Sequence, residues 1–242
     1  MFENIISNTS KTIVGNLDKI KLTLAAIISE GSILIEDYPG SGKTTFAKAI
    51  TSSLGLNFKR IQFTSDLLPS DVLGFNILSD DKLKFQKGPI FTNIVLADEL
   101  NRGSPKAQSA FLEAMEEKNV TIDGESYNLP EPFFVIATQN PMDTSGTSSL
   151  PDSQLDRFMI SYSLSDLDQK EKILMLKKNV SFSNSANETI NWSQINDKKN
   201  EITVKDEIYQ YVVEIEQTIK ALGQNIYISA RCMKQIIDLA KG

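Results

Sequence analysis

The order of elements along the chain predicts an α/β fold, in which a five-stranded parallel sheet is covered by helices on both faces. First, apolar β-branched runs alternate with helical segments as far as residue 163. Second, a Gly-rich turn at residues 40–42 joins one such run to a helix-forming segment. Third, only helical periodicity is found after residue 204. These observations predict an α/β core over residues 1–163 and a small all-helical lid over residues 164–242.

Length and composition place the chain among soluble globular proteins. Its 242 residues fit one large α/β domain, or a main domain with a smaller one. No apolar run approaches the roughly 18 residues needed to span a bilayer, and Met1–Asn4 lacks the basic start of a signal peptide. The single cysteine, Cys232, suits a reducing compartment. We therefore expect a cytoplasmic protein without membrane insertion.

The charged residues limit the chemistry that is open to this chain. It contains no histidine, so catalysis must rest on carboxylates, Lys, Arg, Asn and a bound metal. The formal net charge is −6, which argues against a nucleic-acid partner. Lysine pairs at 177–178 and 198–199 lie in polar segments and are interpreted as solvated surface residues.

Hydrophobic spacing predicts the first elements of the core. Apolar residues at helical spacing indicate helices, β-branched runs indicate strands, and glycine is the usual residue after a helix end. The expected elements are a helix over Leu17–Glu30 capped by Gly31, a strand over Ile33–Ile35, a helix over Phe46–Leu54 closed by Gly55 and a strand over Phe58–Phe63. A short helix is expected over Asp66–Gly74, interrupted by Pro69.

Two hairpins are expected as insertions. Phe75–Phe85 carries Ser79-Asp80-Asp81 in its middle, and such polar residues are typical of a turn between two strands. Val120–Tyr127 carries Asp123-Gly124, the residue pair most typical of a tight hairpin turn.

Buried strands and one amphipathic helix complete the expected core. Apolar runs over Asn93–Ala97 and Pro132–Ala137 predict buried strands, and Leu155–Ser163 predicts a final strand. Pro105–Glu117 has apolar residues at helical spacing and proline in its first turn. Residues 140–152, rich in Gly, Ser, Thr and Pro, predict a loop. In such a parallel sheet, ligands bind at the carboxyl ends of the strands.

The remaining residues predict a helical unit. Residues 178–200 are rich in Asn, Ser and Lys and only weakly periodic, so we expect an irregular surface segment. Helical periodicity returns over Val204–Lys220 and from Ser229 to the chain end. The chain stops at Gly242, inside or just after a helix, and we therefore allow for a lid that is incomplete at its C-terminus.

The turn after the first strand has the features of a phosphate-binding P-loop. Backbone N–H groups of a Gly-rich turn can all point at one phosphate, and the following helix adds its positive N-terminal end. Lys43 would reach the β- and γ-phosphates, and the Thr44 hydroxyl would ligate Mg²⁺. The residues expected to contact the nucleotide here are Pro39, Gly40, Ser41, Gly42, Lys43, Thr44 and Thr45.

One position departs from the P-loop pattern. Glycine is expected at position 37, where this chain has Asp37. Aspartate enters unusual backbone conformations more readily than most residues. The alternative interpretation is a chance Gly-Ser-Gly turn before a helix.

Two carboxylates follow the apolar run at residues 94–97. Asp98 would hold Mg²⁺, and Glu99 would orient and deprotonate the attacking water. This is the Walker B arrangement. Two acids at the end of an ordinary strand would look the same, and the preceding P-loop favours the functional interpretation.

These motifs resemble those of the MoxR-type AAA+ ATPases, in the branch with an insert in the second helix. The resemblance covers nearly the whole chain. The matching stretches are Ile61-Gln-Phe-Thr-Ser-Asp-Leu-Leu-Pro-Ser-Asp71, Leu96-Ala-Asp-Glu-Leu-Asn-Arg102, Gln108-Ser-Ala-Phe-Leu-Glu-Ala-Met115, Ala137-Thr-Gln-Asn-Pro141 and Gln154-Leu-Asp-Arg-Phe158. Some members also carry Glu-Asp before the Pro-Gly-x-Gly-Lys-Thr segment.

The resemblance implies roles for further residues. Asn140 matches sensor 1, which holds the attacking water and the γ-phosphate; a turn-forming Asn is the alternative. Arg157 matches the arginine finger, which acts on ATP in the neighbouring subunit; a surface cation is the alternative. Arg231 matches sensor 2, although Ala230 replaces the usual proline. Ile13-Val14-Gly15 matches the segment that packs on adenine, with a plain loop as the alternative.

The resemblance also implies a function. It is Mg²⁺-dependent ATP hydrolysis by a ring, expected to be a hexamer, coupled to chaperone-like remodelling of a client or adaptor protein, such as one with a von Willebrand factor A domain. The hairpins would face the pore or the client, or simply pack on neighbours. Two alternatives are a nucleotide-gated scaffold with little turnover and a magnesium-chelatase-like motor subunit.

Overall fold

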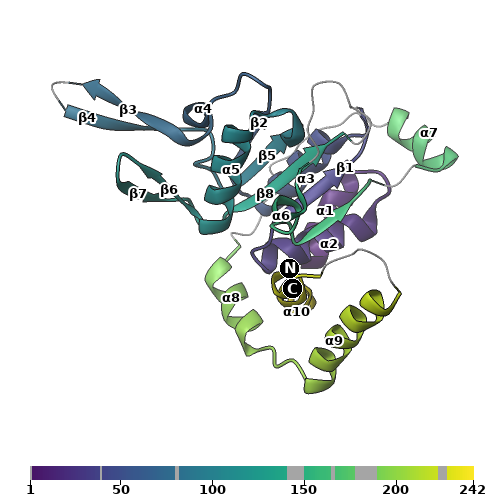
Figure 1. The fold of residues 1–242 in the computed structure, drawn as a ribbon. Helices are drawn as coiled ribbons and strands as arrows, with labels where there is room; N and C mark the ends of the chain where they lie inside the picture. Colours follow the sequence, from purple (N-terminus) through teal and green to yellow (C-terminus); the bar gives the residue numbers. More distant parts are fainter. Residues whose placement is uncertain are drawn as a thin grey trace.

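Five strands form one parallel sheet, in the order β2-β5-β8-β1-β9 (Figure 1). The computed structural model describes residues 2–38, 40–79, 82–140, 150–164, 167–177, 190–222 and 228–242. The strands are β1 (Ile33–Glu36), β2 (Phe58–Gln62), β5 (Ile94–Asp98), β8 (Phe134–Gln139) and β9 (Ile160–Tyr162). Every neighbouring pair is parallel, which confirms the predicted sheet.

Helices cover both faces of the sheet, because its central strands are apolar on both sides. In β5, Ile94 and Leu96 pack on one face and Val95 and Ala97 on the other. The first face is covered by α1 (Phe2–Thr12), α2 (Leu17–Ile28) and α3 (Lys43–Leu54). The second is covered by α4 (Pro69–Leu73) and α5 (Pro105–Glu117). The continuous apolar runs of the sequence therefore correspond to strands that are buried on both faces.

The turn between β1 and α3 requires glycine for its backbone conformation. Gly40 and Gly42 have φ of 85° and 90°, in the left-handed region that side chains disfavour. A Cβ atom on either glycine would meet nothing within 4 Å, so the requirement is conformational and not one of space. Gly42 precedes the first residue of α3, and Gly55 ends the helix as predicted.

Three expectations about local structure are wrong in detail, and one helix has no counterpart among the predicted elements. The α2 helix ends at Ile28, and Glu30, not Gly31, takes the left-handed conformation after it, with φ of 59°. Pro69 begins α4 and does not interrupt it, because the first turn of a helix needs no N–H there. The α1 helix was not predicted, since only Ile5 and Thr9 of it are buried. The final strand is shorter than Leu155–Ser163, with α6 (Asp152–Leu155) before it.

Part of the segment expected to be irregular is a helix. Residues 191–200 mostly belong to α8 (Trp192–Glu201), so the prediction for 178–200 is wrong there. The side chain of Asn191 caps this helix by accepting a hydrogen bond from the N–H of Gln194, at 3.2 Å. Only Ile195 of α8 is buried, and one buried residue leaves no apolar period to detect. Residues 178–189 and 141–149 of the expected loops lie outside the described residues.

Both expected hairpins are present and lie beside each other (Figure 1). They are formed by β3 (Gly74–Ser79) with β4 (Lys82–Lys87) and by β6 (Asn119–Ile122) with β7 (Glu125–Asn128). The ring of Phe85 stacks on that of Tyr127, with centroids 4.2 Å apart. Asn76 also donates a hydrogen bond to Asp123, at 2.6 Å. The two hairpins therefore form one projecting unit.

The residues after the sheet form helices with few buried side chains. These are α7 (Gln169–Lys177), α8, α9 (Asp206–Ala221) and α10 (Ala230–Lys241). Figure 1 shows α7 apart from the other three. The α10 helix lies against α2, where Ser29 Oγ donates to the carbonyl of Asp238 at 2.7 Å. None of the helices in the described ranges is long and apolar enough to cross a bilayer.

Candidate nucleotide site

Two cavities meet at the turn between β1 and α3. The first has a volume of about 350 Å³ and lies at the carboxyl ends of β5 and β8. It is lined by Gly40, Ser41, Gly42, Lys43, Thr44, Thr45, Arg60, Asp98, Glu99, Thr138, Gln139 and Asn140. The second has a volume of about 280 Å³ and shares Gly40, Ser41, Gly42 and Thr45 with the first. The turn therefore separates a polar space from a more apolar one.

Lys43 is held against the turn that precedes it. Its ammonium group donates to the carbonyl oxygens of Asp37 and Tyr38, at 2.9 Å and 2.7 Å. Burial lowers the pKa of Lys43, and the charges of Asp37, Asp98 and Glu99 oppose that shift. Lys43 thus supplies a positive charge to a cavity whose other charged walls include two carboxylates.

Asp98 is a buried carboxylate with both oxygens occupied. Asp98 as a whole residue is only 7% exposed to solvent. Oδ2 accepts from Arg60 Nε at 3.0 Å and from an Arg60 terminal nitrogen at 2.6 Å, while Oδ1 accepts from Thr138 Oγ1 at 2.6 Å. A carboxylate with such partners is fixed in orientation.

Glu99 points its carboxylate into the same cavity from a left-handed backbone conformation, with φ of 54°. Its N–H donates to Thr138 Oγ1 at 2.9 Å. Its Oε2 accepts from Gln62 Nε2 at 2.7 Å and is paired with Arg102 at 3.1 Å. The conformation after β5 therefore turns the second acid away from the strand and toward the cavity.

Sequence reasoning missed Arg60, Gln62 and Thr138. Arg60 and Gln62 lie on the same side of β2, which is the neighbour of β5, and Gln62 is in register with Asp98. Thr138 is fully buried near the end of β8. The available signal was polar residues at alternate positions near strand ends, but only strand order shows that they face Asp98.

Asp37 does not need the conformational freedom of the glycine that the pattern expects. It is not among the described residues with positive φ. Its N–H donates to the carbonyl of Gln139 at 3.2 Å, and its Oδ1 accepts from the N–H of Tyr38 at 2.7 Å. The loop therefore accommodates this side chain. Pro39, which the sequence also assigned to the nucleotide, lies outside the described residues.

The residues around the polar cavity fit Mg²⁺ bound together with phosphates. Within the described ranges there is no group of three acidic, His or Cys side chains that could hold a metal alone. Mg²⁺ usually takes one or two carboxylates together with substrate phosphates and water, so no such group is needed. Thr44 and Asp98 line one cavity and provide the hydroxyl and carboxylate oxygens of that chemistry.

The second cavity is the more apolar of the two. Ile13 and Val14 contribute to its wall, together with Phe46 and Leu164. Val14, chosen from the sequence, thus lies beside Gly40–Gly42 in space, although 26 positions separate it from Gly40 in sequence. Apolar walls next to a phosphate-binding turn are suited to an aromatic base.

The remaining candidates divide into two locations. Asn140 lies at the end of β8 and lines the polar cavity. Arg157 and Arg231 line neither of the two cavities. Both lie beside Glu116 at the end of α5, with Arg157 Nε 3.3 Å from Glu116 Oε2. The structure therefore brings the two arginines together but away from the P-loop of their own chain.

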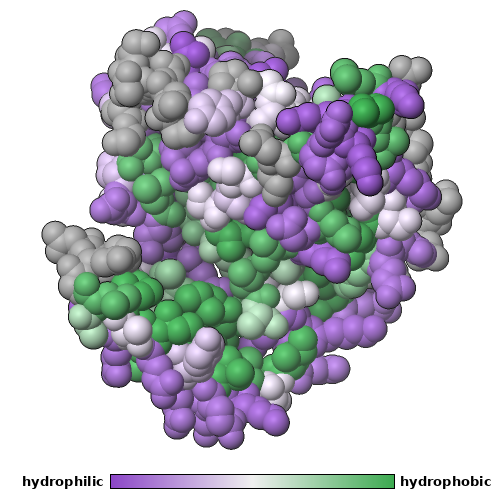
Figure 2. Space-filling model, turned by 90° about the vertical axis from the view of Figure 1, so that its right-hand side faces the viewer, coloured by the Kyte–Doolittle hydropathy of each residue, from purple (hydrophilic) through white to green (hydrophobic). Residues whose placement is uncertain are grey.

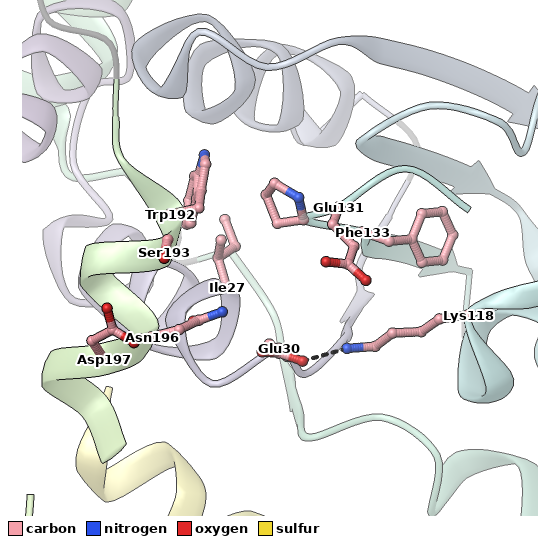
Figure 3. Close-up of a pocket in the computed structure, with 10 residues that line it drawn as sticks. Ile27, Glu30, Lys118, Glu131, Phe133, Trp192, Ser193, Asn196 and Asp197 are labelled. Carbon is pink, nitrogen blue, oxygen red and sulfur yellow. Dashed lines mark hydrogen bonds and ion pairs between the residues drawn. The ribbon is translucent and has the colours of Figure 1, made fainter. Parts of the chain in front are cut away.

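A third cavity, of about 460 Å³, lies apart from these residues (Figure 3). It is formed by the end of α2, the residues before β8, and α8. Trp192 and Phe133 line it, and Lys118 donates to Glu30 at 2.6 Å beside it. No residue selected from the sequence for the nucleotide lines this cavity.

Comparison with known proteins gives a consistent result. Residues 32–160 match the model of the "ATPase family associated with various cellular activities (AAA)". The chain is 53% identical over 156 residues to the uncharacterized protein YeaC of Bacillus subtilis, which covers 64% of this chain and 49% of YeaC. It is 40% identical over 159 residues to the chaperone MoxR1 of Mycobacterium tuberculosis, covering 65% and 42% of the two chains.

A solved structure extends the likeness beyond the sheet. The crystal structure of a presumed ATPase from Cytophaga hutchinsonii is similar with a TM-score of 0.88 and 34% identity. That match covers 99% of this chain and 78% of the other. The chain spans about half the length of the curated relatives it matches.

Proposed function

The chain belongs to the AAA family of ATPases and to its MoxR branch, and on that premise we propose that it binds ATP with Mg²⁺ and hydrolyses the β–γ phosphoanhydride bond. One observation carries the proposal: a polar and an apolar cavity meet at Gly40–Gly42. The polar cavity suits a triphosphate and the apolar cavity suits adenine. A P-loop between them would place the phosphates beside Asp98 and Glu99.

The phosphate groups would be bound by this chain's own donors. N–H groups of the turn and of the first residues of α3 would hold the oxygens, and Lys43 would leave the loop carbonyls to contact them. Thr44 and Asp98 would hold Mg²⁺, which, when bound, neutralises charge on the β- and γ-phosphates. Thr45 lies close enough to both cavities to line each of them.

Hydrolysis would use residues at the ends of β5 and β8. Glu99 would accept a proton from the attacking water, and Asn140 would orient that water and the γ-phosphate. Arg157 would complete the site of a neighbouring subunit, because it lines neither cavity of its own chain. A ring, with a hexamer as the expected form, would then be needed for turnover.

The rest of the molecule would connect turnover to a partner. We propose that residues 164–242 act as the helical lid and that the paired hairpins contact a client or adaptor protein in the cytoplasm. The name of MoxR1 supports a chaperone-like role. A partner with a von Willebrand factor A domain remains part of the proposal.

One observation favours a second candidate, a nucleotide-gated scaffold with little turnover. The carboxylate of Glu99 is hydrogen-bonded to Gln62 and paired with Arg102. If these contacts persist when ATP is bound, Glu99 cannot act as a base. ATP binding without turnover would then be the activity.

The test is ATP turnover per subunit as a function of protein concentration, with Glu99→Gln as the control. We expect turnover per subunit to rise with concentration, because Arg157 acts between subunits. Glu99→Gln should keep ATP binding and lose turnover by on the order of 10²–10⁴-fold. A low and flat rate in a protein that binds ATP would favour the scaffold.

A mixing experiment tests the arginine finger directly. Arg157→Ala has an intact P-loop without a finger, and Lys43→Ala has a finger without an intact P-loop. Each variant alone should be inactive, and a mixture should recover part of the turnover. Absence of any recovery, with both variants shown to associate, would contradict action between subunits.

A further inference from the structure

Glu116 lies between two arginines that come from different parts of the chain. It is in the last turn of α5, and its Oε2 lies 3.3 Å from Nε of Arg157, which follows α6. Its Oε1 accepts a hydrogen bond from a terminal nitrogen of Arg231, in the first turn of α10. One carboxylate thus separates two guanidinium groups, which would repel each other without it.

The two arginines are held in different ways. Arg231 is bound by its terminal nitrogens, to Glu116 and, at 3.9 Å, to Asp156. Arg157 is paired only through its buried Nε, which lies 3.3 Å from Glu116 Oε2 without forming a hydrogen bond. Its two terminal nitrogens make no hydrogen bond to any described residue. The guanidinium group of Arg157 is therefore held at Nε. Its two terminal nitrogens, which can bind phosphate oxygens, remain available.

Two further contacts hold the start of α10 against the residues around Arg157. Ser229, the capping residue of α10, donates to Asp156 Oδ1 at 2.6 Å. Gln235 lies 3.5 Å from the carbonyl of Asp156. Asp156 precedes Arg157 directly, so a displacement of α10 would act on Arg157 through its neighbour and through Glu116.

We propose that Glu116 is a positioning residue that couples α10 to Arg157, so that the seating of this helix determines the position of the guanidinium group offered to the neighbouring subunit. This inference rests on the proposed function, because that function has Arg157 act on ATP bound in the neighbouring subunit. Glu116 itself touches no nucleotide cavity. Its carboxylate links an element of the helical region to a residue at the edge of the sheet.

The test compares Glu116→Gln with Glu117→Gln. The two changes remove the same charge from adjacent residues, but Glu117 is exposed and its side chain has no partner among the described residues. Cys232, next to Arg231 and the only cysteine of the chain, reports on the seating of α10. We expect iodoacetamide to label Cys232 about threefold faster or more in Glu116→Gln, because α10 opens more often. Glu117→Gln should label at the wild-type rate.

Steady-state kinetics give the second measurement, on the assembled protein. In Glu116→Gln we expect kcat to fall on the order of 10–100-fold, because a misplaced group loses about that much. KM for ATP should stay within about twofold, since the residues that contact the bound nucleotide are unchanged. Glu116→Asp should recover part of kcat, and equal melting temperatures would show that all variants are folded.

The outcomes separate the inference from the proposed function. Faster labelling together with a lower kcat in Glu116→Gln alone supports the coupling. Faster labelling with normal kcat would mean that Glu116 only holds α10 in place. Lower kcat with normal labelling would mean that Glu116 acts on Arg157 alone. Either result overturns the coupling. If the wild type binds but does not hydrolyse ATP at any concentration, the proposed function fails first, and the coupling fails with it.

Discussion

The sheet and the helices that follow it differ most in how they are held in place. The strands β5 and β8 are buried on both faces, and Phe63 packs edge-on against Phe111 with ring centroids 5.3 Å apart. In contrast, Leu176 of α7 is 80% exposed and Tyr211 of α9 is 61% exposed. Figure 2, which faces the side where α7 and α9 lie, shows apolar side chains at the surface there.

Because of this difference, we expect the sheet to hold side chains in fixed positions and the helices after it to move. Asp98, Glu99 and Asn140 lie at the ends of close-packed strands, which fix side chains to within the tolerance that chemistry needs. The helices after the sheet bury few side chains, and polar contacts such as Ser29–Asp238 and Glu116–Arg231 help to attach α10. Regions with few buried apolar contacts open at low free energy. We therefore expect the core to hold the site and the helices to move relative to it.

The largest expected difference is in the cost of removing an aromatic side chain. Phe111→Ala should lower the free energy of unfolding by about 3–5 kcal/mol, because Phe111 is fully buried between α5 and the sheet. Tyr211→Ala in α9 should change it by less than about 0.5 kcal/mol. Denaturant unfolding of both variants measures the two values. Similar losses would show that α9 is packed as tightly as the core.

A second comparison concerns one ion pair in each region. Arg60→Met leaves the buried Asp98 without its cation and should lower the free energy of unfolding by about 1–3 kcal/mol. This loss is smaller than for a fully buried ion pair, because about half of the Arg60 side chain is exposed. Lys220→Met removes an i,i+4 pair with Glu216 in α9 and should cost about 0.3–0.5 kcal/mol. Thermal unfolding at one pH compares them. An equal cost would mean that Asp98 finds other partners.

The third comparison concerns the border between the two regions, at Glu30. This residue pairs with Lys118 of the core, at 2.6 Å, and with Lys199 of α8, at 3.7 Å. The hydrogen bond from Lys118 lowers the pKa of Glu30, and the charge of Lys199 adds to this against the opposing effect of burial. Because the folded pKa is below the unfolded one, the stabilisation is present above the ordinary glutamate pKa of about 4.3 and is lost as pH falls through the folded pKa.

Glu30→Gln should remove this part of the pH dependence. The side chain is 45% exposed, so the loss at neutral pH should be about 0.2–1 kcal/mol. The unfolding free energies of wild type and variant should converge once the pH falls below the folded pKa of Glu30, where this residue is protonated in both states. A constant difference at all pH values would indicate lost packing and not lost charge.

Much of the site could be predicted because its signals are local. Gly40 and Gly42 need left-handed backbone conformations, and the apolar run before Asp98 needs burial on both faces. The first requirement selects glycine and the second selects a continuous apolar run, and both can be recognised in the sequence. The helix over Pro105–Glu117 has the predicted limits for the same reason, since its apolar spacing and its capping residue lie within one segment.

The missed features depend on contacts between distant segments. Neither α1 nor α8 has enough buried residues to show a period. The α1 helix packs on α3 and α2, and α8 packs on α2. Arg60, Gln62 and Thr138 are unremarkable polar residues in their own strands. Their role is visible only when β2 and β8 are placed on either side of β5.

The sequence by itself thus determined the sheet, the glycine turn between β1 and α3 and the place of the two acids after a strand, because each follows from the backbone and burial needs of a short segment. Only the tertiary structure decided which side chains face Asp98 and Glu99, and that Arg157 and Arg231 meet at Glu116 instead of at their own P-loop. The physical reason is that strand order and helix docking set distances between residues far apart in the chain, and no local pattern encodes those distances.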